Sequence, residues 1–197
     1  MTPLATDAFD FDEGEGILME AQEGFPKRRL GFWSKLQPAG SCPARPAPAE
    51  MLWSAVGSFL GIGCVTFLAF RYSLPLLVPS FGATAVLIYG AVNSPFAQPR
   101  NVIGGHLVSA ATGVLVYQLM GTGWLSITLA VSLAILFMLF TRTVHPPGGA
   151  TAFVAVWNEQ GYLFILTPVL VGAVMLVLIA LFVNNFGRSR CYPTYWL

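Results

Sequence analysis

The sequence has little charge, and the charge it has avoids the middle of the chain. Only 10% of its 197 residues are Asp, Glu, Lys or Arg, whereas soluble domains usually carry about 25%. Between residues 52 and 187 the charged residues are Arg71, Arg100, Arg142 and Glu159. So long a stretch with so few charges excludes a domain solvated on all sides. It predicts an integral membrane protein surrounded by the lipid bilayer.

Basic residues and cysteines are scarce as well. The 10 Lys and Arg residues are scattered and the net charge is +1, which does not suit a protein that binds nucleic acid. The three cysteines, Cys42, Cys64 and Cys191, form no Cys-x-x-Cys pair and match no zinc spacing. We therefore expect no metal site and no cofactor.

Carboxylates are missing from all the long apolar stretches. Cation carriers and proton pumps usually need a carboxylate within the membrane, so this absence favours an anion or a neutral solute. The same stretches contain no Ser elbow and no metal-ligand set, and the central His145 has no evident catalytic partner. An intramembrane enzyme is therefore the least favoured class, and we expect no enzymatic activity.

Four long apolar stretches are present, at residues 52–70, 102–120, 124–140 and 162–184. They predict an all-α polytopic membrane protein with four full transmembrane helices. We expect residues 1–50 to form a disordered tail that ends beside the membrane. This tail is acidic up to residue 24 and basic afterwards. The membrane domain would cover residues 51–187, and residues 188–197 would form a short basic and aromatic C-terminal tail.

Two segments between the apolar stretches resemble each other. "PSFGATA" (79–85) and "PPGGATA" (146–152) are identical at five of seven positions. Each follows an apolar stretch that ends near an arginine, Arg71 or Arg142, and each precedes another apolar stretch. This pattern predicts two copies of one unit, about 52–120 and 124–186, each with a short broken helix that starts at the Gly-Ala-Thr-Ala motif. The alternative is that these motifs are only small-residue packing faces.

The arginines help to choose between two topologies for the short helices. If each short helix completes a crossing, the basic tail shares one side with Arg100, Arg142, Arg188 and Arg190, and Arg71 lies opposite. If the segments are re-entrant, Arg71, Arg100 and Arg142 all lie opposite the tail. The positive-inside rule favours the first topology. Three crossings per unit would make the two units inverted repeats, as in many transporters.

The break in the second unit is "TVHPPGGATAF", residues 143–153. Prolines lack an N–H, and the residue before a proline avoids helical angles. We therefore expect residues 143–147 to be extended and a helix to run from about 150 to 157. In the first unit we expect residues 71–80 to be extended and residues 82–93 to be helical. Both short helices would then start in or near the membrane, with free N–H groups and the positive end of a helix dipole.

Helix N-termini of this kind form a general anion site, and glycines let an ion approach the backbone closely. We expect His145 at the rim, where it could donate to an anion or titrate near neutral pH; otherwise it caps a helix or bonds to a neighbouring span. Thr84 and Thr151 could add hydroxyl donors. The candidate substrate-binding residues are Gly82, Thr84, His145, Pro146, Pro147, Gly148, Gly149 and Thr151.

Four further residues are candidates for an anion vestibule: Arg71, Arg100, Arg142 and His106. The simpler interpretation of the arginines is that they anchor the protein at the membrane interface. For His106 we favour a structural role, in which the ring satisfies backbone groups or pairs across helices.

Four stretches carry a resemblance to a known family: "PSFGATAV" (79–86), "SPFAQPRNVIGGH" (94–106), "RTVHPPGGATA" (142–152) and "NNFGRSRCYPTYW" (184–196). Over about residues 50–197 the sequence resembles the HPP family of small integral membrane proteins. The resemblance implies four transmembrane helices and small-anion transport, because plastid members in plants are implicated in nitrite transport.

A transporter or channel for a small anion such as nitrite is therefore the leading function, and a non-transporting scaffold or assembly subunit is the alternative. The tail does not look like a transit peptide. We expect the plasma (inner) membrane if the chain is bacterial, and the plastid envelope is the alternative for a photosynthetic eukaryote. A bundle of so few short crossings is thin, which would suit a homo-oligomer.

Overall fold

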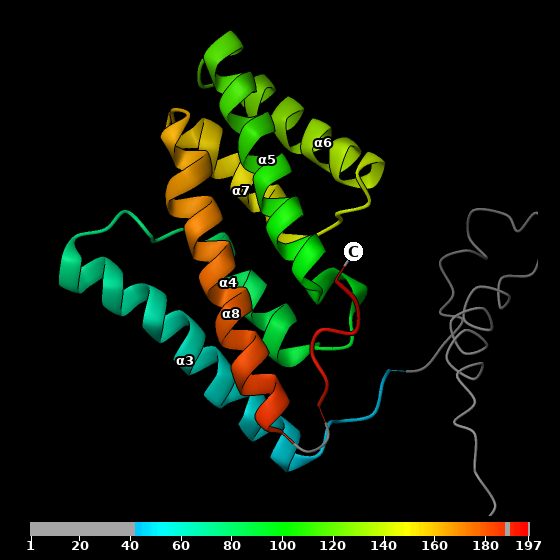
Figure 1. The fold of residues 1–197 in the computed structure, drawn as a ribbon. Coiled ribbons are helices and arrows are strands. Elements are labelled where there is room, and N and C mark those ends of the chain that lie inside the picture. The colour runs from blue at the N-terminus through cyan, green and yellow to red at the C-terminus, as the bar shows by residue number, and fades with distance from the viewer. Residues whose placement is uncertain (1–41, 188–189, 197) are drawn as a thin grey trace, which may run out of the picture. The chain divides into compact units, whose positions relative to one another are not determined.

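The computed structural model describes residues 42–187 and 190–196. The chain divides into one unit up to Arg45 and a second unit from Pro46 to Leu197, and all the helices described below belong to the second unit (Figure 1). Most of the predicted N-terminal tail lies outside the described residues, and so does Arg188.

The described part of the chain is helical and contains no strand, which confirms the all-α prediction for that part. In chain order the elements are α3 (Pro48–Tyr72), α4 (Ser80–Ala85), the π-helical turn η1 (Val86–Gly90), the 3-10 turn η2 (Pro95–Ala97), α5 (Pro99–Met120), α6 (Trp124–Phe140), α7 (Pro147–Trp157), the π-helical segment η3 (Ile165–Leu170) and α8 (Val171–Phe186).

Prolines set where three of these helices begin. Pro48, Pro99 and Pro147 each occupy the first turn of α3, α5 and α7. A proline is well placed there because its fixed φ suits a helix and its missing N–H would have no partner within the helix.

Three helices of the described chain are long and apolar enough to cross a membrane: α3 with 25 residues, α5 with 22, and η3 joined to α8 with 22. The bounds of α6 match the predicted stretch 124–140, but α6 has only 17 residues, fewer than the roughly 20 of a typical span. The prediction of four full transmembrane helices is therefore supported only in part.

One end of the bundle, which we call the first end, contains the start of α3, the ends of η1 and α8, and the start of α5. Arg190, just beyond α8, donates to the carboxylate of Glu50 at 2.7 Å and to the carbonyl of Tyr89 at 3.0 Å. Tyr195, in the same C-terminal segment, donates to the side-chain oxygen of Asn101 at 3.1 Å. The C-terminal segment runs from the end of α8 toward the start of α5 (Figure 1), and these bonds tie it to α3, η1 and α5.

The other helix ends follow from two more contacts. Arg100 donates to the carbonyl of Thr141 at 3.2 Å, so α6 ends at the first end. Thr122, before α6, donates to the carbonyl of Val156 at 3.1 Å, so α7 ends at the opposite end. Residues 73–90 therefore return from the far end of α3 to the first end, and residues 143–157 run in the reverse direction. Arg71 lies at the far end of α3.

The two short helices begin earlier than the sequence indicated, and that prediction was wrong. α4 starts at Ser80 and, with η1, ends at Gly90, against a predicted 82–93. α7 starts at Pro147 and ends at Trp157, against a predicted 150–157. The preceding residues, Pro79 and Pro146, already have helical angles, with φ −55° and −51°. Proline fits the first turn of a helix, so the extended segments end before it.

The fourth apolar stretch is also interrupted. Thr167 has φ −133° and ψ 119°, which is extended backbone inside η3, and Pro168 follows it. A proline lacks the N–H of the helical ladder and disfavours helical angles in the residue before it. Residues 162–184 are therefore not one continuous helix.

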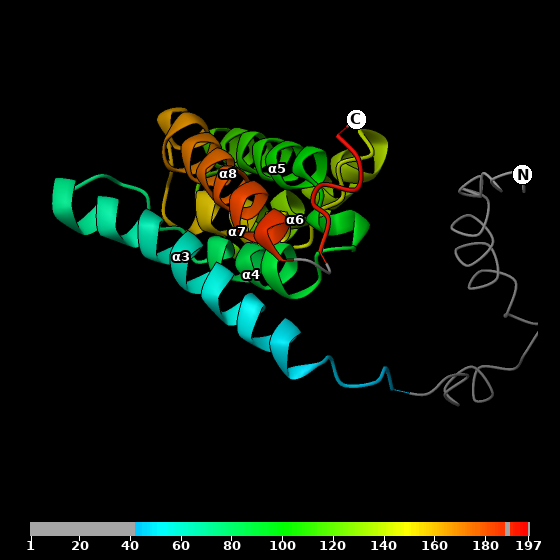
Figure 2. The ribbon, with the colours of Figure 1, turned by 60° about the horizontal axis from the view of Figure 1, so that its bottom comes forward.

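Glycines let these helices pack closely. α3 packs against α8 and η1, and α5 packs against α6 and α7 (Figure 2). A Cβ at Gly57 would lie 2.6 Å from the ring of Tyr89, and a Cβ at Gly113 would lie 2.7 Å from the carbonyl of Ala152. Small residues at such contacts are typical of helices that associate in a membrane.

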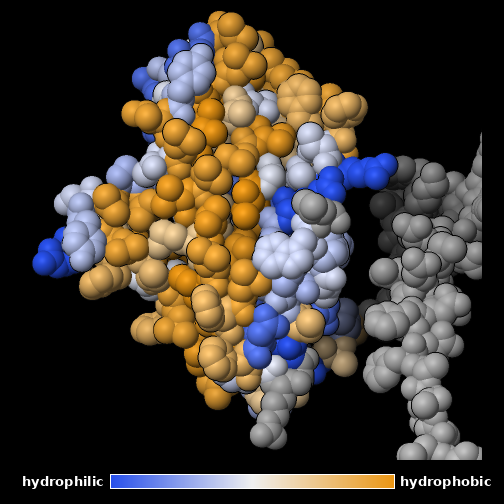
Figure 3. Space-filling view, viewed as in Figure 1, coloured by the Kyte–Doolittle hydropathy of each residue, from blue (hydrophilic) through white to orange (hydrophobic). Residues whose placement is uncertain are grey.

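The surface is largely apolar, as a lipid-facing surface requires. Phe59, Phe70 and Phe140 are 77%, 81% and 86% exposed. Figure 3 shows hydrophobic residues over most of the face in view, with hydrophilic residues toward its margins. In water, exposed aromatic residues in such number would promote aggregation. The surface and the apolar helices together support an integral membrane protein.

Candidate functional site

His106 joins the two Gly-Ala-Thr-Ala motifs inside the bundle. Its Nε2 lies 2.8 Å from Oγ1 of Thr84, the threonine of the first motif, and its Nδ1 lies 2.8 Å from Oγ1 of Thr151, the threonine of the second. The ring is fully buried. These contacts are those of a residue that pairs across helices, which is the interpretation favoured for His106, whereas a vestibule would need solvent to reach the ring.

His145 is the second buried ring, with no exposed surface. Its Nε2 lies 2.9 Å from Oγ1 of Thr84, and its Nδ1 lies 2.8 Å from the carbonyl of Phe96. The rings of His145 and His106 meet edge to face, with centroids 4.8 Å apart. One threonine hydroxyl therefore lies within hydrogen-bond distance of both histidines. At the rim of an open site, His145 would instead keep a free ring nitrogen.

Ser80 completes the group, with its Oγ 2.9 Å from Oγ1 of Thr151. We refer to five residues as the histidine–threonine cluster: Ser80, Thr84, His106, His145 and Thr151. They come from α4, α5, α7 and the segment before α7, and all of them are buried. The cluster contains imidazole and hydroxyl groups and no carboxylate or cation.

The first amides of the two helices beside the cluster are hydrogen-bonded, although the sequence led us to expect free N–H groups at these helix starts. In α7 the N–H of Gly148 donates to the carbonyl of His145 at 2.8 Å, and that of Gly149 donates to the carbonyl of Pro146 at 3.1 Å. In α4 the two amides that follow Ser80 donate in the same way to carbonyls three residues earlier, at 3.0 and 3.1 Å. Tight turns at the start of each helix satisfy these groups.

The glycines of the motifs differ in their surroundings. A Cβ at Gly148 would lie 2.6 Å from Oγ of Ser109 in α5, so this position is needed for close packing. Gly149 has only Val131 within 4 Å, at 3.9 Å, and Gly82 has nothing within 4 Å. Pro147 is buried whereas Pro146 is exposed.

The three candidate vestibule arginines lie away from the cluster. Arg71 and Arg142 are exposed, and the guanidinium of Arg71 lies 5.3 Å from the ring centre of Tyr72. Arg100 donates to the carbonyl of Thr141 at the first end. These positions suit interfacial anchors, and no contact of the described residues links the three side chains to the histidines.

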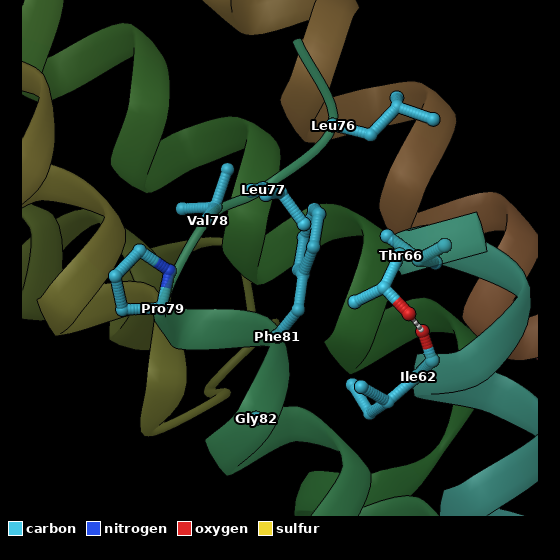
Figure 4. A pocket seen from close by; sticks show the side chains of 9 residues that line it. Ile62, Thr66, Leu76, Leu77, Val78, Pro79, Phe81 and Gly82 are labelled. Atoms are coloured by element: carbon cyan, nitrogen blue, oxygen red, sulfur yellow. Dashed lines mark hydrogen bonds between the residues drawn. The ribbon is translucent and has the colours of Figure 1, made fainter. Parts of the chain in front are cut away.

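An apolar cavity lies beside α4 and is separated from the cluster by one ring. Its volume is about 330 Å³, and it is lined by Ile62, Val65, Thr66, Leu76, Leu77, Val78, Pro79, Phe81 and Gly82 (Figure 4). The ring of Phe81 meets the ring of His106 edge to face, with centroids 5.4 Å apart. A Cβ at Gly172 would overlap Phe81, so α8 limits where this ring can move.

The C-terminal segment is connected to His145 through η2. The three successive carbonyls of η2 accept hydrogen bonds in order from Tyr195 at 3.0 Å, from His145 at 2.8 Å and from Tyr192 at 2.8 Å. A second route uses Asn101, which accepts from Tyr195 and donates at 2.9 Å to the carbonyl of Val144, next to His145. The C-terminal segment therefore helps to fix the position of the histidine.

The two tyrosines of this segment lie beyond α8, outside the apolar helices. Burial raises the pKa of Tyr192 above its ordinary value, and nearby Tyr89 adds to the effect. Burial also raises the pKa of Tyr195, and Arg100 opposes that change. Both phenols therefore stay protonated near neutral pH and can donate the hydrogen bonds described.

Sequence reasoning did not select Ser80, Asn101, Tyr192 or Tyr195. Ser80 lies within the "PSFGATA" motif, but the second motif has a proline at that position. The similarity of the two motifs therefore does not indicate a role for Ser80. The tyrosines lie in a segment that carries the family resemblance, yet only the fold brings them to η2.

Comparison with known proteins identifies the family of this chain and two similar membrane proteins. The family model described as HPP, transmembrane region, matches residues 43–193. The chain is 42% identical over 180 residues to one transmembrane protein of Dictyostelium discoideum and 43% identical over 166 residues to another.

These alignments cover 85% and 78% of this chain but only 58% of each relative, so the chain spans less than two thirds of their length. No solved structure matches. The family model covers well over half of the chain, and the apolar helices fit its description. The chain belongs to the HPP transmembrane region family of membrane proteins.

Proposed function

We propose that this protein is a membrane transporter or channel for a small inorganic anion such as nitrite, with the histidine–threonine cluster as its binding site. The observation that carries the proposal is the convergence of Thr84 and Thr151, one from each motif, on His106. Hydrogen-bond donors from both units thus meet inside an apolar bundle, and no carboxylate is among them.

This chemistry favours an anion. A small anion loses its hydration inside an apolar bundle, and that cost is offset only if oriented donors replace water. The hydroxyls of Thr84, Thr151 and Ser80 and the N–H groups of the two imidazoles can do so. A carboxylate in the cluster would repel an anion.

The structure represents a closed state under this proposal, because the cluster residues are bonded to one another. An anion replaces hydroxyl–imidazole bonds when it binds, for example that between Thr84 and His145. Movement of Phe81 connects the cluster to the apolar cavity beside α4. The hydroxyl and imidazole groups of the cluster bond to one another in the closed state and to the anion in the occupied state.

The path of the chain supports a specific topology for this transporter. Residues 73–90 and 143–157 run in opposite directions between the two ends of the bundle, which suits two inverted units with three crossings each. The first end, with Arg100 and Arg190, would face the cytoplasm. Three further points stay predictions: that nitrite is the substrate, that the protein lies in the inner membrane or the plastid envelope, and that it forms a homo-oligomer.

A non-transporting scaffold or assembly subunit is the second candidate, and one observation favours it. Among the described residues, no buried side-chain nitrogen or oxygen lacks a hydrogen-bond partner. A fully satisfied network can simply fix the way in which helices pack. Under this reading the cluster binds no solute.

Uptake into proteoliposomes distinguishes the two candidates. The wild-type protein is reconstituted beside Thr151→Val, which removes a hydroxyl of the cluster, and Thr128→Val, which removes an exposed hydroxyl bonded to the carbonyl of Trp124. We expect nitrite uptake by the wild type and by Thr128→Val, and a loss of about tenfold or more in Thr151→Val, as one lost charge-assisted bond implies.

The anions tested are nitrite, nitrate, formate and chloride. If the folded wild-type protein takes up none of them, the transporter proposal is wrong and the scaffold reading is favoured. If Thr151→Val transports as well as the wild type, the cluster is not the binding site.

A further inference from the structure

The hydrogen atoms of the histidine–threonine cluster can be placed by elimination, starting from its one backbone acceptor. A carbonyl only accepts, so Nδ1 of His145 donates to the carbonyl of Phe96. When His145 is neutral, its Nε2 carries no hydrogen and accepts from the hydroxyl of Thr84. The single hydrogen of that hydroxyl is then used.

The remaining directions follow in the same way. Because the Thr84 hydrogen is used, Nε2 of His106 donates to the Thr84 oxygen. Nδ1 of a neutral His106 then accepts from the hydroxyl of Thr151. If Nδ1 instead carries a hydrogen, the hydroxyl of Thr151 donates to Oγ of Ser80. With both rings neutral, the cluster contains one chain of hydrogen bonds with one direction, from Thr151 through His106, Thr84 and His145 to the carbonyl of Phe96.

The cluster can also hold one additional proton without losing a hydrogen bond. Oγ1 of Thr84 lies 3.1 Å from the carbonyl of Ser80, and Oγ1 of Thr151 lies 2.9 Å from Oγ of Ser80 and 3.4 Å from the carbonyl of Pro147. If a ring gains a proton and donates to either threonine, that hydroxyl can turn its own hydrogen to one of these acceptors. Acceptors for both protonation states are therefore already in place.

We infer that the histidine–threonine cluster binds one proton, shared between His106 and His145 through the hydroxyl of Thr84, and that this proton crosses the membrane together with the anion. The coupling rests on the proposed function, because it requires a transported anion. The proton site itself rests only on the geometry of the cluster.

The transfer between the rings is balanced. The N–H bond at Nε2 of a protonated His106 breaks as an O–H bond forms on Thr84. The original O–H bond of Thr84 breaks as an N–H bond forms at Nε2 of His145. The positive charge moves from one ring to the other, and Thr84 ends with one hydrogen as it began.

The surroundings of the rings explain why a proton and an anion would travel together. The cluster faces uncharged groups: Phe81 from α4, the carbonyl of Phe96 from η2, and Ser109 from α5 beside Gly148. Arg71, Arg142 and Glu159 are exposed, while Arg100, Tyr195 and the Glu50–Arg190 pair make their contacts at the first end. An imidazolium without a counterion is costly in such a place, and a bound anion supplies the counterion.

The coupling is tested in proteoliposomes that contain a trapped fluorescent pH indicator. Nitrate is the first probe, because it is the anion of a strong acid and carries no proton across lipid by itself; nitrite is the second. Internal anion and internal pH are measured together. We expect acidification to accompany anion uptake by the wild type and by Thr128→Val, which alters an exposed hydroxyl outside the cluster, and loss of both in Thr84→Val, which removes the relaying hydroxyl.

The proton site is tested separately by nitrogen-15 NMR of the histidine rings, in protein without a histidine tag. The chain has only two histidines, so their signals are assigned with His106→Asn and His145→Asn. We expect one imidazolium per chain when pH is lowered in the presence of nitrate, and its two ring nitrogens both in hydrogen bonds.

The possible failures are distinguishable. Anion uptake without acidification overturns the coupling and leaves the proposed function standing. An imidazolium signal in a folded protein that takes up none of the tested anions overturns the proposed function and leaves the proton site. Rings that both stay neutral throughout the pH range of transport overturn the proton site. Folding of each variant is checked by circular dichroism and size-exclusion chromatography.

Discussion

Thr84 and Thr151, the equivalent threonines of the two Gly-Ala-Thr-Ala motifs, hold opposite nitrogens of one imidazole, each at 2.8 Å. They are 67 positions apart in the chain. A ring that bonds both motifs fixes α4 and α7 relative to α5, so the polar cluster contributes to the fold as well as to the proposed function. The variants below separate these two contributions.

The first prediction concerns the hydroxyl of Thr151. Thr151→Val leaves Nδ1 of His106 and the hydroxyl of Ser80 with one partner fewer inside the bundle. We expect a loss of about 1–3 kcal/mol in the free energy of unfolding, as for other buried polar groups that lose a partner. Thermal unfolding in detergent measures it, and Thr128→Val, at an exposed hydroxyl, is the matched control. Equal melting temperatures for the two variants would contradict a structural contribution of the cluster.

The second prediction uses the two adjacent glycines of the central motif. Gly148→Ala places a Cβ 2.6 Å from Oγ of Ser109 and 3.0 Å from Sδ of Met138, so we expect it to cost about 1–3 kcal/mol, as overpacking does. Gly149→Ala meets only ordinary contact at 3.9 Å and should be neutral or slightly stabilising. Thermal unfolding of both variants measures the difference. The reverse order would show that α7 packs on α5 through another face.

The third prediction concerns Arg190, whose side chain is only 6% exposed. It donates to the side chain and carbonyl of Glu50, to Ser54, to the carbonyl of Tyr89 and to Asn184. Arg190→Ala should release the C-terminal segment and lower the melting temperature. Arg190→Lys should not restore the melting temperature, because one lysine ammonium cannot donate to all of these acceptors at once.

Limited proteolysis of the C-terminus gives the second measurement for Arg190. We expect faster cleavage in Arg190→Ala, and no change in Arg142→Ala, since Arg142 is an exposed arginine at the same end. Cleavage of the two variants at the same rate would mean that Arg190 does not secure the segment.

The fourth prediction is a pH dependence of the C-terminal segment. The pKa of Tyr192 is raised by burial, so the folded protein keeps this proton to a higher pH than the unfolded chain. The stability that Tyr192 contributes is then complete below about pH 10, the value for an unperturbed tyrosine, and is lost as pH rises through the higher folded pKa. Fluorescence of Trp196 against pH, with Tyr192→Phe as control, measures the release. A release that begins well below pH 10, or that is unchanged in Tyr192→Phe, would contradict this account.

The sequence was sufficient to predict the parts of the fold that depend on local pattern. The scarcity of charge predicted a membrane protein, the apolar stretches predicted the helices, and the bounds of α6 match the sequence. The prolines were correctly identified as breaks. Their exact effect was wrong by two or three residues, because Pro147 was assigned to an extended segment although it fits the first turn of a helix.

The sequence did not predict which residues of the candidate site bond to one another. The repeat indicated that Thr84 and Thr151 could share a site, but the partner of both is His106, which lies 22 and 45 residues away from them. No periodicity or motif encodes a pairing over such separations. The free N–H groups expected at Gly148 and Gly149 are bonded to the preceding turn, and that turn depends on how α7 packs against α5.

The most direct test of the central proposal, that an anion binds at the histidine–threonine cluster, is the nitrogen-15 NMR spectrum of the two histidines with and without nitrite. The protein is held in lipid bilayers at constant pH, and nitrite is added to saturation of uptake. We predict that nitrite shifts the ring signals of both His106 and His145, because it replaces their bonds to Thr84, and that the shifts are lost in Thr84→Val. Ring signals that do not move, in a preparation that takes up nitrite, would contradict the account.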